Sequence, residues 1–401
     1  MKKNFIAVFV GLGLSVIILL CAEGVFILNK RFAFFSQPQV VERALGEDPE
    51  LTEFIKTKYQ QSHWARQDME NFFSVQQQAP RSTKLDYSLK HGGPHERRNL
   101  WLTSSIFRPN LKFRSLVKVE NSDRVIYDVT IDTNERSRRV VVFNGTSQDQ
   151  GVLFFGDSNT FGEGVNSDET YASQFAKLNP QYQVFNFGVG GSAPNVFLEE
   201  IENFPQYRYT DLKVPAKNIG VYLIIDDTIE RMICRLNCLR EYRRWMLKHP
   251  YYKLNSQGEL EYQGSFAQSR KGVNSVYSFF ASSALLDFYR VDYPLAIRQS
   301  DMDFMAKVIK VYTDKLKKHM NLERFVVFSY PGSRLDPEMY KAAFAKVGIE
   351  FWDFSQVDFG RITDGRSAYP WDYHPTPVGH YLLAELLTYK LKQTNPKGGI
   401  R

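Results

Sequence analysis

The stretch VLFFGDSNTFGEG places a serine directly after a short apolar run. Ser158 follows Gly156 and Asp157, so its hydroxyl is expected at the end of a strand, beside the backbone amides that open the next helix. A serine there can act as a nucleophile if a base takes its proton and hydrogen-bond donors receive the developing negative charge. For an isolated Gly-Asp-Ser tripeptide a turn or helix cap is the simpler role, so the partners of Ser158 decide its function.

Candidates for the base and its orienting acid lie near the end of the chain, in the stretch YPWDYHPTPVGHYLLAELL. His374 can take the serine proton, and Asp372 can hold its imidazole, because alternate residues of an extended turn share a side. Asp358 and Asp364, in the preceding loop, are alternatives to Asp372. His380 falls within the following helical segment, where we expect it to pack or to cap.

GDSNTFGEG, NFGVGGSAP and the stretch around His374 resemble sequence blocks of the SGNH, or GDSL, family of serine esterases and acyltransferases. The resemblance covers residues 150–392. It implies that Ser158 is the nucleophile, His374 the general base and Asp372 the orienting acid. It also implies that the backbone amides of Ser158 and Gly191 bind the oxyanion, and that neither a metal nor an organic cofactor is needed. Most of the family has Asp-x-x-His, whereas this chain has Asp-x-His.

A third family block is altered in this chain. The family resembles Gly-x-Asn-Asp after its third strand, with the Asn amide as a further oxyanion donor; the chain has LIIDDT, with Ile224 and Asp226 in place of that Gly and Asn. An ionised carboxylate has no proton to donate, so Asp226 can join the oxyanion hole only if it is held neutral. Losing one donor typically costs two to three orders of magnitude in rate, roughly 3 to 4 kcal/mol.

Short runs that are apolar at every residue recur after residue 151, separated by stretches of helix length. They are GVLFF, YQVFNFG, NIGVYLII, RFVVFSYP and IEFWDFS. Such runs are typical of strands buried on both faces, and the spacers indicate parallel crossovers. We therefore expect an α/β fold of the flavodoxin-like or SGNH hydrolase type, a three-layer, doubly wound, mostly parallel sheet. Its site should lie beyond the carboxyl ends of the strands.

The chain begins MKKNFIAVFVGLGLSVIILLCAEGVFIL, which is apolar over residues 5–28 except for Glu23. At about 1.5 Å per residue this length can cross ~30 Å of hydrocarbon, which predicts an N-terminal transmembrane helix. The prediction is a single-pass protein of the bacterial inner membrane, with its C-terminal domain in the periplasm. Ala22, Glu23 and Gly24 also fit the spacing that signal peptidase reads, so secretion after signal cleavage is the alternative.

Composition and pattern divide the chain into segments. These are an anchor or signal segment 1–30, a mixed region 31–115 of unknown role, a β-hairpin lead-in 116–148, an SGNH-like domain 149–393 with an insertion near 231–275, and a tail 394–401. A polar helix is expected around residues 40–75, and the lead-in is expected to turn at Asn134 and Glu135. The insertion combines a basic helical stretch with a second hairpin around Gln257 and Gly258.

Charge and cysteine content exclude several classes of protein. The chain has 401 residues and a net charge of +7, from 51 Lys and Arg against 44 Asp and Glu. This excess is too diffuse to indicate nucleic-acid binding. Three cysteines, Cys21, Cys234 and Cys238, cannot form a disulfide framework, and two neighbouring thiols fall short of a zinc site. We expect free or loosely paired thiols and no metal.

Three functional hypotheses follow. The first is a membrane-tethered serine esterase that acts on small acyl esters, such as acetyl esters, through an acyl-Ser158 intermediate. The second is an O-acyltransferase of envelope polysaccharide. The tether and the aromatic-rich insertions favour it, as does the Asp-x-His spacing, which resembles that of alginate-type O-acetyltransferases. The third is a binding protein that kept the fold and lost the chemistry, as the residues at Ile224 and Asp226 suggest.

Overall fold

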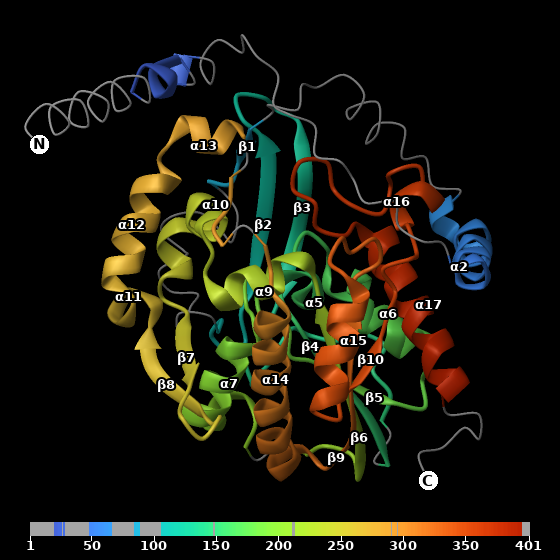
Figure 1. The fold of residues 1–401 in the computed structure, drawn as a ribbon. Helices are drawn as coiled ribbons and strands as arrows, with labels where there is room; N and C mark the ends of the chain where they lie inside the picture. The colour runs from blue at the N-terminus through green and yellow to red at the C-terminus, as the bar shows by residue number, and fades with distance from the viewer. Residues whose placement is uncertain are drawn as a thin grey trace, which may run out of the picture. The chain divides into compact units, whose positions relative to one another are not determined.

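The protein is described by a computed structural model. It covers residues 20–25, 27–28, 48–65, 84–88, 106–146, 149–210, 213–289, 291–294 and 296–394. The chain forms two compact units: a smaller one from residues 1–43 and 230–298, and a larger one from residues 44–229 and 299–401. The larger unit contains the parallel sheet (Figure 1).

Five strands form this central sheet. In chain order they are β4 (Gln150–Phe155), β5 (Gln183–Asn186), β6 (Lys217–Ile224), β9 (Leu322–Ser329) and β10 (Glu350–Trp352). Across the sheet their order is β10-β9-β6-β4-β5, and every neighbouring pair is parallel. This is the flavodoxin-like order, in which the chain starts in the middle of the sheet and reverses its winding once. The predicted α/β fold with a central parallel sheet is confirmed.

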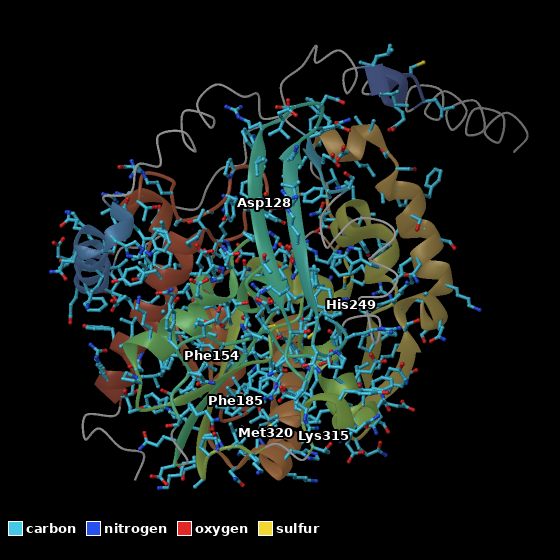
Figure 2. The ribbon with its side chains drawn as sticks, turned by 180° about the vertical axis from the view of Figure 1, so that it is seen from behind. Asp128, Phe154, Phe185, His249, Lys315 and Met320 are labelled. Carbon is cyan, nitrogen blue, oxygen red and sulfur yellow. The ribbon has the colours of Figure 1, made fainter. Side chains whose placement is uncertain are left out.

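Helices cover both faces of the sheet (Figure 1). The long ones are α6 (Tyr171–Leu178), α7 (Pro194–Asn203), α14 (Gln299–Met320), α15 (Pro337–Lys346) and α17 (Pro377–Thr394). Phe154, labelled in Figure 2, packs its ring 5.0 Å from Tyr171 of α6. Its neighbour Phe155 packs 5.6 Å from Tyr312 of α14. Successive strand residues point to opposite faces, which is why strands such as β4 are apolar at consecutive positions.

Short helices complete the larger unit. They are α5 (Ser158–Phe161), η3 (Ser167–Glu169), α8 (Pro205–Arg208) and α16 (Phe359–Ile362), with α9 (Asp226–Ile233) leading into the smaller unit. Two residues lie between the end of β4 and the start of α5, and one residue lies between β6 and α9. Short turns of this kind bring the first residues of a helix to the carboxyl edge of the sheet, where ligands of such folds bind.

The region before residue 115 is also part of the larger unit. It contributes α2 (Pro49–Gln61), η1 (His63–Ala65), β1 (Leu85–Asp86) and β2 (Lys112–Val119). The polar helix predicted around residues 40–75 is therefore present as α2. Its Phe54 ring lies 4.3 Å from Tyr389 of α17, whose hydroxyl donates a 2.7 Å hydrogen bond to Glu50. These contacts attach the N-terminal region to the last helix of the fold.

The predicted lead-in hairpin was wrong in its pairing. β3 (Val125–Asp132) pairs antiparallel with the upstream β2, and β1 extends the sheet beyond β2. A turn does follow β3 near Glu135, and backbone hydrogen bonds such as that from the Val140 amide to the Asp132 carbonyl at 3.2 Å close it. Among the described residues, the stretch after the turn forms isolated bridges at Arg139 and no strand. Arg139 is 1% exposed and donates from Nη2 to the Val165 carbonyl at 2.7 Å. The stretch after the turn therefore contains the buried Arg139 and does not add a strand to the sheet of β2 and β3.

The smaller unit surrounds a two-stranded sheet. Its elements are α10 (Leu236–Met246), β7 (Pro250–Leu254), β8 (Leu260–Ser265), α11 (Phe266–Ser269), α12 (Lys271–Ala281) and α13 (Ala284–Phe288). β7 and β8 pair antiparallel around Gly258, at the place of the second predicted hairpin. The insertion reaches Arg298 rather than residue 275. Its basic helical stretch is broken at Cys234, a buried free cysteine with a φ of 52°.

The predicted transmembrane helix falls largely on residues outside the described part of the chain. Residues 20–25 and 27–28 are helical, whereas residues 5–19 are not described. Among the described residues, no helix combines the length and the apolar character needed to cross a bilayer.

Candidate active site

Ser158 lies where β4 ends and α5 begins, at the carboxyl edge of the sheet. Gly156 and Asp157 form the turn between them. The Asp157 carboxylate accepts a 3.0 Å hydrogen bond from the Asn159 amide and so caps α5. This cap fixes Ser158 as the first residue of the helix, with 8% of its surface exposed. The serine therefore occupies the rigid position that the sequence predicts for it.

His374 and Asp372 lie next to this serine in space, although 216 residues separate Ser158 from His374. The Nε2 atom of His374 is 2.9 Å from Ser158 Oγ, and its Nδ1 atom is hydrogen bonded to Asp372 Oδ1. The Asp372 side chain is 2% exposed and that of His374 is 19% exposed. The three side chains form a continuous chain of hydrogen bonds from a buried carboxylate to a hydroxyl.

The Asp-x-His spacing works because the loop between the two residues is sharply turned. Tyr373 adopts a left-handed φ of 63°, an uncommon conformation for a residue with a side chain. The loop is closed by two backbone hydrogen bonds with Tyr369: its amide donates to the His374 carbonyl at 2.8 Å, and its carbonyl accepts from the Tyr373 amide at 2.9 Å. This turn brings Asp372 to the Nδ1 side of the imidazole with one residue between the two.

The arrangement is chemically competent for proton transfer from serine. A carboxylate on Nδ1 favours the tautomer that carries its proton there, which leaves the lone pair of Nε2 facing the Ser158 hydroxyl. The same carboxylate stabilises the imidazolium that forms when His374 takes the serine proton. The described residues contain no group of three or more His, Cys, Asp or Glu side chains arranged to hold a metal ion.

The other two candidate acids have different places. Asp358 accepts a 3.0 Å hydrogen bond from the Arg361 amide and caps α16. Asp364 lies in the loop that follows α16, with a left-handed φ of 51°. Of the three aspartates considered, Asp372 is the one that is hydrogen bonded to His374.

His380 has the packing role that we expected. It is fully buried, its Nδ1 atom accepts a 3.2 Å hydrogen bond from the Tyr171 amide, and its ring stacks on that tyrosine. Burial lowers the pKa of His380 to about 3. It is therefore neutral at neutral pH, and it joins α17 to α6 rather than serving as the base.

The loop after β5 is held against the turn that carries the serine. The Asn186 side chain donates to the Thr160 carbonyl at 2.8 Å and accepts from the Gly188 amide at 2.9 Å. A Cβ atom at Gly188 would lie 2.3 Å from the backbone nitrogen of Phe161, so only glycine fits there. The close approach of this loop to α5 explains why the sequence has glycine at this point.

Gly191, the predicted second oxyanion donor, ends this loop. Its φ of 71° lies in the left-handed region, which orients its peptide differently from an ordinary strand residue. The amide of Ser158 belongs to the first residue of α5, and such amides have no partner within their own helix. The fold thus carries the two predicted donor amides on two segments that are packed together.

Asp226 does not have the role predicted for it. It is the first residue of α9, and its carboxylate accepts hydrogen bonds from the Ser333 hydroxyl and from the Arg334 amide, the latter at 3.0 Å. An oxyanion hole requires donors, whereas Asp226 serves here as an acceptor for a turn after β9. The inclusion of Asp226 in the oxyanion hole was therefore wrong, because its carboxylate serves a structural contact instead.

Replacing Asp226 should affect stability more than catalysis. In Asp226→Ala, Ser333 and Arg334 lose their acceptor, and we expect the free energy of unfolding to fall by about 1 to 2 kcal/mol. Asp226→Asn keeps an acceptor oxygen, so kcat/KM should stay within about twofold of wild type. If the side chain did face the oxyanion, the new amide would raise the rate by about a hundredfold. Urea unfolding and ester hydrolysis, with Asp227→Asn as the control, separate these outcomes.

Tyr87 is a site residue that the sequence analysis missed. It follows the two-residue strand β1, and its hydroxyl donates a 3.1 Å hydrogen bond to Asp372 Oδ2, the oxygen that His374 does not use. Partial burial and the charge of Asp372 raise the pKa of Tyr87 well above its ordinary value, so it remains a donor. Tyr87 is a positioning residue: it holds the carboxylate that in turn holds the imidazole. No motif surrounds it, and pairing of β1 with β2 brings it there.

Tyr87→Phe should lower kcat by about tenfold, because the Asp372 carboxylate loses a contact that holds it in position against His374. Without this donor the Asp372 carboxylate holds the His374 imidazolium more strongly. The acidic limb of the kcat/KM profile should therefore move to higher pH. A pH profile of ester hydrolysis tests this, with Tyr207→Phe as an exposed control. A purely structural role would reduce stability and leave the profile in place.

Comparisons with known proteins give structural matches only. No protein-family model and no curated protein matches the chain. A lipolytic G-D-S-L family member from Veillonella parvula has 13% identity and a TM-score of 0.33, over 60% of this chain and 97% of that one. An acetyl xylan esterase from Butyrivibrio proteoclasticus has 13% identity and a TM-score of 0.36, over 65% and 66%. A salicylyl-acyltransferase of a tetracycline biosynthetic pathway has 11% identity and a TM-score of 0.32, over 70% and 61%.

Proposed function

We propose that the chain is a serine esterase of the SGNH type that acts on small acyl esters through an acyl intermediate on Ser158. The observation that carries this proposal is the hydrogen-bonded series from Asp372 through His374 to Ser158, with its 2.9 Å contact between Nε2 and Oγ. Its place at the carboxyl edge of a parallel sheet is where sites of such folds occur. A buried carboxylate, an imidazole and a hydroxyl in series have few structural uses and a well-understood chemical one.

The reaction would proceed in two balanced steps. Ser158 Oγ attacks the ester carbonyl carbon while His374 takes its proton, and the amides of Ser158 and Gly191 bind the resulting oxyanion. Collapse breaks the bond to the leaving alkoxide, which receives the proton from His374, and the acyl group stays on the serine. In the second step a water or an acceptor hydroxyl gives its proton to His374 and attacks the acyl carbon. Collapse then breaks the bond to Ser158 Oγ, which receives that proton from His374 and is regenerated as a hydroxyl.

The test is the release of p-nitrophenol from p-nitrophenyl esters of increasing acyl length by the purified full chain. We expect a preference for acetyl and other short acyl groups. Intact-mass analysis after rapid quenching should show an acyl adduct on the wild type. A folded protein that neither hydrolyses these esters nor reacts with a fluorophosphonate would refute the proposal and favour the binding-protein hypothesis.

O-acyl transfer to a carbohydrate is a second candidate, favoured by one observation. Tyr373, between Asp372 and His374 in the chain, is 78% exposed, the greatest exposure of any large hydrophobic side chain in the described residues. An exposed aromatic ring in a fixed left-handed loop can stack against the apolar face of a sugar. An envelope polysaccharide hydroxyl would then replace water in the second step.

Tyr373→Ala should distinguish the two acceptors. If Tyr373 binds a sugar, the variant should have a KM for an oligosaccharide acceptor raised about fivefold, corresponding to about 1 kcal/mol of stacking. Its kcat/KM for p-nitrophenyl acetate with water as acceptor should change less than twofold. The measurement is the ratio of acetylated oligosaccharide to free acetate, with Tyr207→Ala as a control. An equal loss with both acceptors would contradict a sugar-binding role.

We further propose that residues 5–28 tether the enzyme to the bacterial inner membrane, with the catalytic domain on the periplasmic side. The apolar run and the lysines that precede it support this placement. Sodium carbonate extraction of membranes tests the tether. Recovery of the chain in the soluble periplasmic fraction, with a mass that lacks the first residues, would show that the segment is a cleaved signal instead.

A further inference from the structure

The smaller unit presents an unusual apolar surface on α12. Val273, Val276 and Phe280 follow the i, i+3, i+7 spacing of one helix face, and Phe279 lies beside them. Their exposures are 43%, 53%, 43% and 74%, and the rings of Phe279 and Phe280 contact each other at 5.4 Å. These four side chains are called the apolar ridge below. Exposed apolar residues that are grouped in this way mark an interaction surface.

The apolar ridge has a fixed orientation, because another side of α12 packs into the core of the smaller unit. Asn274 is buried and donates to the Phe266 carbonyl at 2.7 Å, and Tyr277 and Ala281 pack into the core of the smaller unit. The exposed residues on the remaining flank are polar, Ser275 and Ser278 among them. The helix thus has three sides: one buried, one polar and exposed, and one apolar and exposed.

The charge of the smaller unit gives the first indication of what the ridge contacts. Residues 1–43 and 230–298 contain 16 Lys and Arg against 8 Asp and Glu, a net charge of +8, whereas the whole chain carries +7. The unit that bears the ridge therefore holds all of the net positive charge of the protein. Some of its arginines are buried in ion pairs, Arg235 among them, while Lys248, Lys253 and Lys271 are exposed. Apolar side chains and exposed lysines on one unit of net positive charge are the combination that binds to the interface of an anionic bilayer.

The N-terminal segment gives the second indication. Glu23 accepts hydrogen bonds from the Ser283 hydroxyl at 2.7 Å and from the Leu285 amide at 3.2 Å, and so binds the start of α13. Exposed apolar side chains lie on both sides of Glu23, at Leu20 and at Val25. The end of the apolar N-terminal segment is therefore attached to the helix that directly follows the ridge.

We propose that the apolar ridge of α12 lies on the surface of an anionic phospholipid bilayer, as a second membrane contact beside the N-terminal segment. Phe279 and its neighbours enter the boundary between head groups and acyl chains, while lysine and arginine of the same unit face the lipid phosphates. The contact would fix the orientation of the smaller unit at the membrane. It does not depend on the activity of the Ser158 site.

Site-specific fluorescence tests the proposal on the full chain bound to vesicles. The background is Cys21→Ser with Cys238→Ser; Cys234 is buried, which raises its thiol pKa to about 11 and keeps it unreactive. Val276→Cys and Phe279→Cys place a bimane label on the ridge, and Ser275→Cys and Ser278→Cys place it on the polar flank. The vesicles contain phosphatidylcholine with phosphatidylglycerol, or phosphatidylcholine alone. The quenchers are a nitroxide-labelled lipid and aqueous iodide.

We expect lipid quenching at the two ridge positions to exceed that at the two flank positions by about twofold or more, with the opposite order for iodide. Lipid quenching at the ridge should also fall when phosphatidylglycerol is left out. Equal quenching at all four positions would overturn the proposal, as would equal quenching with and without anionic lipid. Ridge labels shielded from both quenchers would indicate a protein occupant, either another part of this chain or a second copy, and would overturn it too. Ester hydrolysis by each labelled variant checks that it is folded.

Discussion

Ser158→Ala is expected to lower kcat/KM for p-nitrophenyl acetate by three orders of magnitude or more, about the loss that follows removal of a catalytic nucleophile. The reason is that the substitution removes Oγ, the one atom of Ser158 able to form the acyl intermediate. β4 and the capped turn before α5 remain in place. The same variant should give no adduct with a fluorophosphonate when its intact mass is measured. His374→Ala should still react, more slowly, because the nucleophile remains and only its activation is lost.

A matched control for this experiment is Ser329→Ala. Ser329 is another buried serine at the carboxyl end of a sheet strand, where its hydroxyl accepts from the Phe354 amide at 2.8 Å. That variant should still be labelled, at Ser158. Labelling of Ser158→Ala to the wild-type extent would place the reactive group elsewhere and remove the basis of the proposed mechanism.

Asp372→Asn should have the second largest effect, a loss of about three to four orders of magnitude in kcat. An amide in this position cannot stabilise the imidazolium, and it can donate to Nδ1, which would put the proton of His374 on the wrong nitrogen. The fold should tolerate the change because the side chain keeps its shape and can still accept from the Tyr87 hydroxyl. Stopped-flow hydrolysis and thermal unfolding together separate the catalytic loss from a structural one.

Asp358→Asn provides the comparison. Asparagine caps helices about as well as aspartate, so this variant should retain kcat within about twofold. A large loss in Asp358→Asn with a small one in Asp372→Asn would show that the acid has been assigned to the wrong residue. Both substitutions replace one carboxylate oxygen with an amide nitrogen and remove one negative charge. A general effect of lost charge would therefore change the kcat of both variants alike.

The parallel sheet could be predicted from sequence because its signal is repeated and local. Strands such as β4 are buried on both faces, so Phe154 and Phe155 both had to be apolar, and helix-length spacers left few other ways to connect the strands. The positions of Ser158 and His374 were equally predictable, since both are bounded by glycine or proline turns. Their separation by 216 residues did not prevent the prediction, because all strands of a parallel sheet have their carboxyl ends at the same edge.

Other features depend on tertiary contacts that no local pattern records. The downstream stretch that looked like a partner for β3 instead buries Arg139, and the true partner, β2, precedes it. Tyr87 reaches Asp372 because β1 pairs with β2, a ladder of only two residues. The family pattern indicated that a carboxylate at Asp226 was unusual for an oxyanion donor. It did not predict the contact with Ser333, through which this side chain holds a turn.

The early serine and late histidine have a consequence for biosynthesis. A chain that emerges from the ribosome with its N-terminus first presents Ser158 long before His374, and domains generally fold in that order. Until the loop that carries Asp372 and His374 has emerged, and α17 has docked on α6 and α2, the serine has no base. During synthesis Ser158 is thus an unactivated hydroxyl until the segment with Asp372 and His374 comes into place.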